Sequence, residues 1–238
     1  MRKIATFILC AILISKIAIA QNSINIVTYK AMFAEKFSEG SSANKDLGFL
    51  DEIVKGKEVF FELIFNKNEA NYKQKNELDV NDFDAKIKKA LFGGNTFFYL
   101  NTKNREYISQ IEAYGEIFLV PLVKWKWKLT NESKKIGSYK CYKATTIKTV
   151  DNSEGVFSFL VTAWFTNEIP VNFGPKGYYG LPGLILELHE NKQVHFAQNI
   201  KLNQNSINGI EKPTKGIKMT HKEFEAFGKN FYEKNKKI

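Results

Sequence analysis

The chain of 238 residues is poor in the residue types that build crosslinked, metal-bound or nucleic-acid-binding proteins. It has two cysteines and three histidines, which is too few for a disulfide framework, and the histidines lack the spacing of a zinc site. Arginine occurs only as Arg2 and Arg105, whereas proteins that read DNA rely on arginine for guanine edges and phosphates. No apolar run reaches the roughly 20 residues that span a bilayer. We therefore expect no metal, no cofactor, no nucleic acid and no membrane-spanning helix.

The first twenty residues predict a secretory signal peptide. The basic pair Arg2-Lys3 precedes a mainly apolar stretch over residues 4–14, and the segment ends in Ala18-Ile19-Ala20. A basic start, a short apolar run and small residues at the end are typical of such leaders. We expect cleavage between Ala20 and Gln21 and export to the periplasm, outer membrane or cell surface. An uncleaved N-terminal anchor is the alternative.

Loss of this leader would change the charge and the cysteine content. It removes three cations and no acid, so the net charge of +10 becomes +7. The lysines are spread along the chain, which favours a solvated basic surface; attraction to an anionic envelope or polysaccharide is the alternative. Cys141 would be the one cysteine left. We expect it to be a small buried hydrophobe, with a reactive or intermolecularly paired thiol as the alternative.

Alternating apolar residues predict that residues 21–238 form a single β-rich domain. Strand patterns separated by turn residues occur in series. They cover residues 23–37, 57–74, 96–129, 137–149, 156–166, 184–189 and 193–202. Helical spacing predicts two short helices, over residues 44–54 and 79–92. The expected fold class is therefore mainly β (α+β), an antiparallel sheet with a few short helices.

The C-terminal segment has a different pattern. Thr220-His221-Lys222-Glu223 is a capping box, in which the threonine and glutamate side chains bond to each other's backbone N–H groups. Phe224, Phe227 and Phe231 follow at spacings of three and four residues. This pattern predicts an amphipathic helix whose aromatic stripe covers an apolar surface.

Two segments are candidates for binding. In residues 124–129 tryptophan alternates with lysine, so a strand there would place Trp125 and Trp127 on one face and three ammonium groups on the other. An aromatic platform for a ligand and a half-buried structural strand are both compatible with this pattern. Residues 174–183 contain four glycines and two prolines, and Leu181-Pro182-Gly183 suits a type II turn with Gly183 at positive φ.

The turn lies within Gly180-Leu181-Pro182-Gly183-Leu184-Ile185, which resembles the signature of the GLPGLI family of exported Bacteroidetes proteins. Residues 61–66, 135–144 and 163–170 resemble blocks of the same family in the same order. The family has no established activity, so the resemblance implies no catalytic residue. Its layout is similar to the curved half-barrels of periplasmic lipoprotein carriers, which implies a curved sheet or half-barrel with the C-terminal helix as a cap.

These observations predict a non-enzymatic binding or accessory module of the envelope, with an apolar small molecule or an envelope protein as its partner. The candidate ligand-facing residues are Trp125, Trp127, Trp164, Tyr178 and Tyr179. The residues expected to shape the site are Gly174, Pro175, Gly180, Leu181, Pro182 and Gly183.

Two other functions stay open. A peptide or glycan hydrolase would use the carboxylates and imidazoles of Glu168, Glu187, His189 and His195. No Gly-x-Ser-x-Gly, His-Glu-x-x-His or Cys-His signature accompanies them. A purely structural accessory of an outer-membrane transporter is the other alternative, and it differs from the binding module in having no small-molecule ligand. The sequence leaves the ligand, the oligomeric state and the role of Cys141 open.

Overall fold

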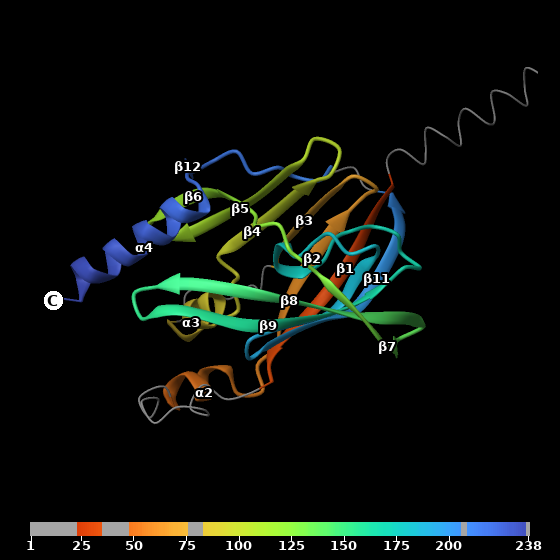
Figure 1. Cartoon of the computed structure of the whole chain (residues 1–238), viewed down its shortest axis with the longest axis horizontal. Helices are drawn as coiled ribbons and strands as arrows, with labels where there is room; N and C mark the ends of the chain where they lie inside the picture. Colours follow the sequence, from red (N-terminus) through yellow and green to blue (C-terminus); the bar gives the residue numbers. More distant parts are fainter. Residues whose placement is uncertain (1–22, 35–47, 76–82, 206–208, 237–238) are drawn as a thin grey trace, which may run out of the picture.

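The computed structural model describes residues 23–34, 48–75, 83–205 and 209–236. In these ranges twelve strands form one curled sheet with the order β12-β6-β5-β4-β3-β2-β1-β11-β10-β9-β8-β7 (Figure 1). Neighbouring strands are antiparallel, except that β12 runs parallel to β6. The predicted curved antiparallel sheet is confirmed, whereas the predicted cleavage point between Ala20 and Gln21 lies outside the described residues.

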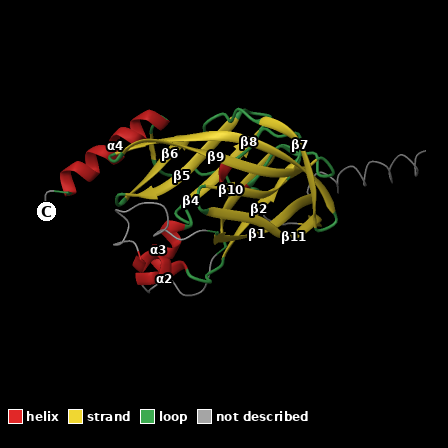
Figure 2. Cartoon of the chain, turned by 60° about the horizontal axis from the view of Figure 1, so that its bottom comes forward, coloured by secondary structure: helices red, strands yellow, loops and turns green. Residues whose placement is uncertain are grey.

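The bounds of the elements follow the predicted hairpins closely. The strands are β1 (Ser23–Phe33), β2 (Val59–Phe65), β3 (Glu69–Gln74), β4 (Thr96–Asn101), β5 (Glu106–Ala113), β6 (Glu116–Pro121), β7 (Lys128–Ile136), β8 (Tyr139–Asn152), β9 (Gly155–Thr166), β10 (Leu184–Glu190), β11 (Gln193–Asn205) and β12 (Ile217–Lys218). The helices are α2 (Gly48–Val54), α3 (Phe83–Leu91) and α4 (His221–Asn235), with a 3-10 turn η2 (Pro175–Gly177). Helices α2 and α3 lie together below the sheet, well away from α4 (Figure 2).

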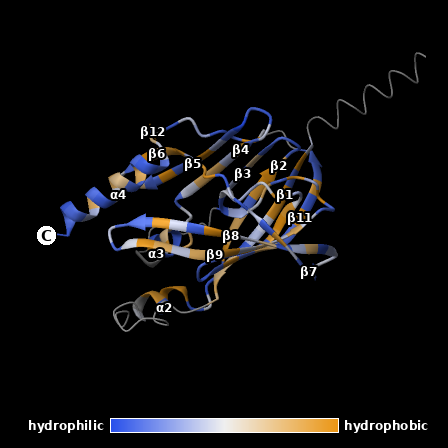
Figure 3. Cartoon of the chain, viewed as in Figure 1, coloured by the Kyte–Doolittle hydropathy of each residue, from blue (hydrophilic) through white to orange (hydrophobic). Residues whose placement is uncertain are grey.

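The core lies on the concave face of the sheet, where alternate residues of the strands are buried. In β2 the buried and half-buried residues alternate without a break, and the apolar character of this strand stands out in Figure 3. The turn from β2 to β3 is fixed by Asn66, whose side chain accepts hydrogen bonds from the backbone N–H groups of Asn68 and Glu69, both at 2.8 Å. On β1, Tyr29 is fully buried and donates to the carbonyl of Ile185 at 2.5 Å.

Two connections close over the concave face. β7 is the last strand at one end of the sheet, and β6 lies beside β12 at the other end. Residues 122–127, here called the strap, therefore cross from one end region to the other (Figure 1). Residues 167–183, here called the plug loop, join β9 to β10 and contact β3 and β4 through η2. The concave face is therefore filled by the chain's own loop, with the strap packed over it.

The predicted C-terminal helix is confirmed, together with its capping box. Phe224 and Phe227 pack on Phe118 of β6, each with ring centroids 5.2 Å apart. On its other side, Lys229 pairs with Asp151 of the β8–β9 hairpin at 2.6 Å. α4 therefore bridges β6 and the tip of this hairpin.

Two parts of the predicted strand pattern are wrong. Residues 124–127 form no strand; they run extended in the strap, and the strand starts at Lys128. The strand β7 was missed because its sequence is polar and mostly exposed, without apolar alternation. It lies at the outer end of the sheet, where charged residues are common because they discourage pairing with other chains.

Candidate functional site

The tryptophans of the strap point inward and bond to the plug loop. The Trp125 ring stacks on Tyr178 with centroids 4.2 Å apart, and its Nε1 donates to the Gly177 carbonyl at 3.4 Å. Trp127 Nε1 donates to the Tyr179 carbonyl at 2.8 Å. Buried indole N–H groups need such partners, and backbone carbonyls supply them here. The lysines that alternate with the tryptophans are exposed, as the pattern predicts.

The two tyrosines of the plug loop are also engaged within the chain. Tyr178 is completely buried under Trp125. Tyr179 stacks on Tyr107 of β5, with centroids 4.5 Å apart. In the structure Trp125, Trp127 and both tyrosines lie at the plug loop. Tyr178, however, faces the core instead of an open ligand site, because the loop folds into the concave face that a ligand would have filled.

The glycines of the plug loop act differently from the predicted type II turn. The φ angle of Gly183 is not positive, so that turn assignment is wrong; Gly177 and Gly180 are the positive-φ glycines of the loop. Gly183 is required because a Cβ there would lie 2.0 Å from the Thr166 carbonyl oxygen. Likewise, a Cβ on Gly174 would lie 2.6 Å from Ile185. Close packing against β9 and β10 explains both residues.

Trp164 lies apart from the other predicted ligand-facing residues. It is on β9, half-buried, and the Lys134 Nζ lies 4.4 Å from its ring centroid. Cross-strand pairing puts Trp164 opposite Glu187 and Lys143, whereas its neighbours Ala163 and Phe165 belong to the core packed around Tyr178. The five predicted residues therefore do not form one site.

Of the groups that a hydrolase would need, Glu187 and His189 are in contact, whereas His195 lies on the other face of the sheet. Glu187 accepts hydrogen bonds from Lys134 at 2.7 Å and lies 2.5 Å from His189 Nε2. Burial opposes the ionised form of Glu187, but these two partners outweigh it and lower its pKa. His195 is paired with Leu188, the residue that follows Glu187 in β10. Its side chain therefore lies on the opposite face of the sheet from that of Glu187. Glu168 is engaged by the Lys140 backbone N–H at 2.8 Å.

Cys141 is fully buried on β8, where burial raises its thiol pKa to about 11. The thiol therefore stays protonated and unreactive at neutral pH. In the ranges that the structure describes, no three metal-ligating side chains gather, and no helix is long and apolar enough to cross a membrane.

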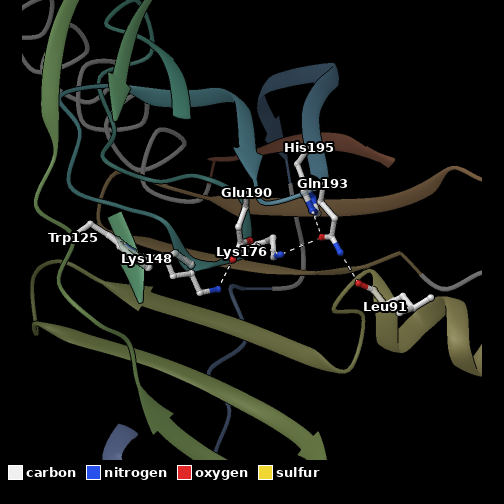
Figure 4. Close-up of polar contacts among 8 residues, drawn as sticks. Leu91, Trp125, Lys148, Lys176, Glu190, Gln193 and His195 are labelled. Carbon is white, nitrogen blue, oxygen red and sulfur yellow. Dashed lines mark hydrogen bonds and ion pairs between the residues drawn. The ribbon is translucent and has the colours of Figure 1, made fainter. Parts of the chain in front are cut away.

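A polar cluster that no sequence pattern predicted lies inside the curled sheet. This interior polar cluster consists of Lys148, Lys176, Glu190, Gln193 and His195 (Figure 4). Both lysines contact the Glu190 carboxylate. Lys176 also donates to Gln193 Oε1 at 3.1 Å, and Gln193 donates onward to the Leu91 carbonyl at 2.5 Å. The cluster combines residues from β8, the plug loop, β10 and β11, so only the folded sheet brings it together.

Burial and the charges of neighbouring residues together set the ionisation of this cluster. For Glu190 burial alone would raise the pKa, but Lys176 and Lys148 outweigh it and lower the pKa to about 2. Burial lowers the pKa of His195 to about 3, with Lys176 adding to the effect. Burial also lowers the pKa of Lys176, and Lys148 repels its charge. At neutral pH the cluster therefore has a charged carboxylate and a neutral imidazole, whose Nδ1 lies 2.9 Å from the Tyr72 hydroxyl.

A cavity lies between α4 and the β8–β9 hairpin. This α4 groove has a volume of about 610 Å³. Its lining residues are Tyr114, Val150, Asp151, Asn152, Ser153, Phe224, Glu225, Gly228, Lys229, Phe231, Tyr232, Asn235 and Lys236. Phe231 and Tyr232 are 40% and 41% exposed. The aromatic stripe predicted from the sequence thus covers β6 with one part and lines an open groove with the other.

Comparison with known proteins identifies relatives of part of the sequence and of the fold. A family model described as "Protein of unknown function (Porph_ging)" matches residues 127–159 and 156–187, which span β7, β8, β9, the plug loop and the start of β10. No curated protein matches the chain.

Among solved structures, those of PNGF-II in the C2 and P21 space groups have a TM-score of 0.51, with 18% and 19% sequence identity. They cover 86% and 87% of this chain but only 32% and 33% of the PNGF-II chain, so this chain spans about a third of its length. LprF from Mycobacterium bovis matches with a TM-score of 0.26 and 11% identity, over 83% of this chain and 96% of that one. The chain thus resembles PNGF-II in fold and, in residues 127–187, a family of unknown function.

Proposed function

We propose that the protein is a non-enzymatic binding module that holds an apolar small molecule in the α4 groove. The observation that carries this proposal is the groove itself: about 610 Å³ of space between a helix and a hairpin, where four aromatic side chains and Val150 share the lining with polar and charged residues. Pockets for small molecules have volumes of roughly 300–1,000 Å³ and mainly apolar walls. The volume fits a molecule such as an acyl chain, and the aromatic part of the lining would supply its apolar contacts.

The exposure of α4 supports this assignment. No residue of the helix is completely buried, although three phenylalanines and a tyrosine occur within nine residues of it, from Phe224 to Tyr232. Large aromatic side chains that stay in contact with water on a continuous surface often mark a binding site. An apolar ligand in the groove would remove Phe231 and Tyr232 from water, gaining about 25 cal/mol for each Å² buried.

The rim of the groove favours a ligand with one polar end. Asp151 and Lys229 are paired across it at 2.6 Å, and Glu154 accepts a hydrogen bond from the Tyr232 hydroxyl at 3.3 Å. These contacts hold the helix to the hairpin and leave the apolar wall between them open. Polar groups at the mouth of an apolar pocket commonly fix the orientation of a ligand.

The compartment is part of the same proposal. The leader-like residues 1–20 support export, and a carrier or accessory protein of the cell envelope would encounter acyl chains there. An envelope protein that inserts an apolar segment into the groove is the other occupant that the lining allows, and the experiment below separates the two.

Titration with the fluorescent fatty acid cis-parinaric acid tests the proposal. We expect a saturable rise in fluorescence with the full chain, lost in Val150→Glu because a carboxylate would then lie in the apolar groove. Ile147→Glu is the matched control: Ile147 is on the same strand, is 58% exposed and does not line the groove. Equal binding by both variants, or no binding by the unmodified chain, would contradict a small-molecule site and favour the protein partner.

A further inference from the structure

The interior polar cluster opens into a second, smaller cavity. Its volume is about 150 Å³, and none of its lining residues lines the α4 groove. The lining residues are Phe33, Leu91, Phe159, Lys176, Glu190, Asn191, Lys192 and Gln193. The cavity thus combines three apolar side chains with charged and amide groups, and it is independent of the proposed function.

The charges beside this cavity do not balance. The Glu190 carboxylate is only 4% exposed and contacts the ammonium groups of both Lys148 and Lys176. With both lysines protonated, the trio has an excess of one positive charge; the Lys176 side chain is 18% exposed and the Lys148 side chain 32%. A buried charge is costly unless an opposite charge is close to it. The excess would therefore be stabilised by an anion in the cavity.

The fold directs Lys176 toward this position. Lys176 is in the left-handed region at φ +55°, a conformation that is uncommon for residues other than glycine. Its side chain is 18% exposed, and its ammonium group has three N–H donors. Glu190 and Gln193 Oε1 account for two of them, which leaves one donor for a ligand.

The apolar part of the lining restricts the class of anion. Phe33, Leu91 and Phe159 form the apolar part of the wall, and Lys148 lies 5.9 Å from the Phe159 ring centroid. An inorganic anion has no apolar part, so these three side chains would remain in contact with water. An anion with a short hydrocarbon body would contact them and place its charged end at Lys176.

We propose that this cavity is a binding site for a small organic carboxylate. The carboxylate accepts a hydrogen bond from Lys176 Nζ, and the hydrocarbon part packs between Phe33, Leu91 and Phe159. Lys148 does not line the cavity; it contributes by neutralising Glu190, which frees the charge of Lys176 for the ligand.

Calorimetric titration of the full chain with benzoate tests the site. We expect saturable binding of benzoate, no binding of the neutral analogue benzyl alcohol, and no displacement of benzoate by inorganic phosphate. Lys176→Met should weaken benzoate binding at least tenfold. If benzyl alcohol binds as well as benzoate, or phosphate displaces it, the carboxylate assignment is wrong. If benzoate does not bind at all, the site itself is refuted.

Two further variants separate the charge argument from simple damage to the cavity. Lys148→Met leaves every lining residue in place but cancels the excess charge, so benzoate binding should weaken several-fold. Glu190→Gln increases the excess charge, so binding should tighten, and near-UV circular dichroism checks that each variant is folded. Unchanged affinity in both variants would overturn the proposal even if Lys176→Met proves unfolded.

Discussion

At the scale of single residues, the absence of side chains shapes the molecule as much as their presence. Gly174, Gly177 and Gly183 each lie where a Cβ would come within 2.6 Å or less of a neighbouring atom. At Gly183 the neighbouring atom is the Thr166 carbonyl oxygen. As a backbone atom, it cannot move away by a change of rotamer, as a side chain could. The plug loop can therefore fill the concave face only because its backbone approaches β9 and β10 directly.

Replacement of Gly183 by alanine should be strongly destabilising. The added methyl group would start 2.0 Å from the Thr166 oxygen, so β9 and the loop must separate, at a cost of about 3 kcal/mol or more. Gly48→Ala is the control, because it has open space around it and starts helix α2. Urea denaturation measures both variants, and a loss below about 1 kcal/mol in Gly183→Ala would rule out this close contact.

Single residues also show where prediction from the sequence ends. The alternation of tryptophan and lysine in residues 124–128 predicts two faces, and in the structure the tryptophans are half-buried and the lysines exposed. It could not show that the partners of the indoles are the Gly177 and Tyr179 carbonyls, 52 residues away. The interior polar cluster was missed for the same reason: Lys148, Lys176 and Glu190 are unremarkable charges in the sequence and meet only across the folded sheet.

At the scale of elements, α4 depends on its cap and on its contact with β6. The Thr220 hydroxyl accepts a hydrogen bond from the Glu223 backbone N–H at 3.2 Å. This bond satisfies one of the N–H groups that have no partner within the helix. The helix is anchored by Phe224 and Phe227 near this end, and residues from Phe224 to Asn235 line the α4 groove.

Thr220→Ala should therefore loosen the start of α4. We expect a loss of about 1 kcal/mol in the stability of the helix and faster amide hydrogen exchange in its first two turns. Binding of cis-parinaric acid should weaken as well, because the groove needs the helix in place. Thr214→Ala, an exposed threonine in the preceding loop, is the control. Equal exchange rates in the two variants would show that the cap does not hold the helix.

Elements with a local signal were predicted well and those without one were not. The β2–β3 hairpin and the capping box of α4 depend on neighbouring residues, so their sequences suffice. The strap is extended but unpaired because it must cross the whole sheet from β6 to β7. That requirement comes from the strand order, which cannot be predicted from the residues of the strap.

At the scale of the whole molecule, the buried ionisable groups make stability depend on pH. His195 has a pKa of about 3 in the folded chain, against an ordinary value of 6.5. Below pH 6.5 the unfolded chain takes up a proton that the folded chain excludes, so acid favours unfolding. Glu190, with a pKa of about 2 against 4.5, stabilises the fold above pH 4.5 and loses this effect only below that value.

Between pH 6.5 and 4.5 we therefore expect His195 to lower the free energy of unfolding by about 1.4 kcal/mol for each pH unit. Urea denaturation across this interval measures the slope. In His195→Asn the starting stability should be lower, because the contact with Tyr72 is altered, but the contribution of this proton to the slope should disappear. An identical slope in the variant would mean that another group is responsible.

The pairing of β1 with β11 has a consequence for the order in which the chain is made. Residues such as Tyr29 and Ala197 are neighbours in the sheet, although most of the polypeptide separates them. While the chain emerges from a ribosome or a secretion channel, the early hairpins can assemble, but the open edge of β1 has no partner until residues 193–205 arrive. Unpaired edges recruit other strands, and distant pairings form slowly. The nascent chain would therefore remain unfinished, and open to chaperones, until nearly all of it had been delivered.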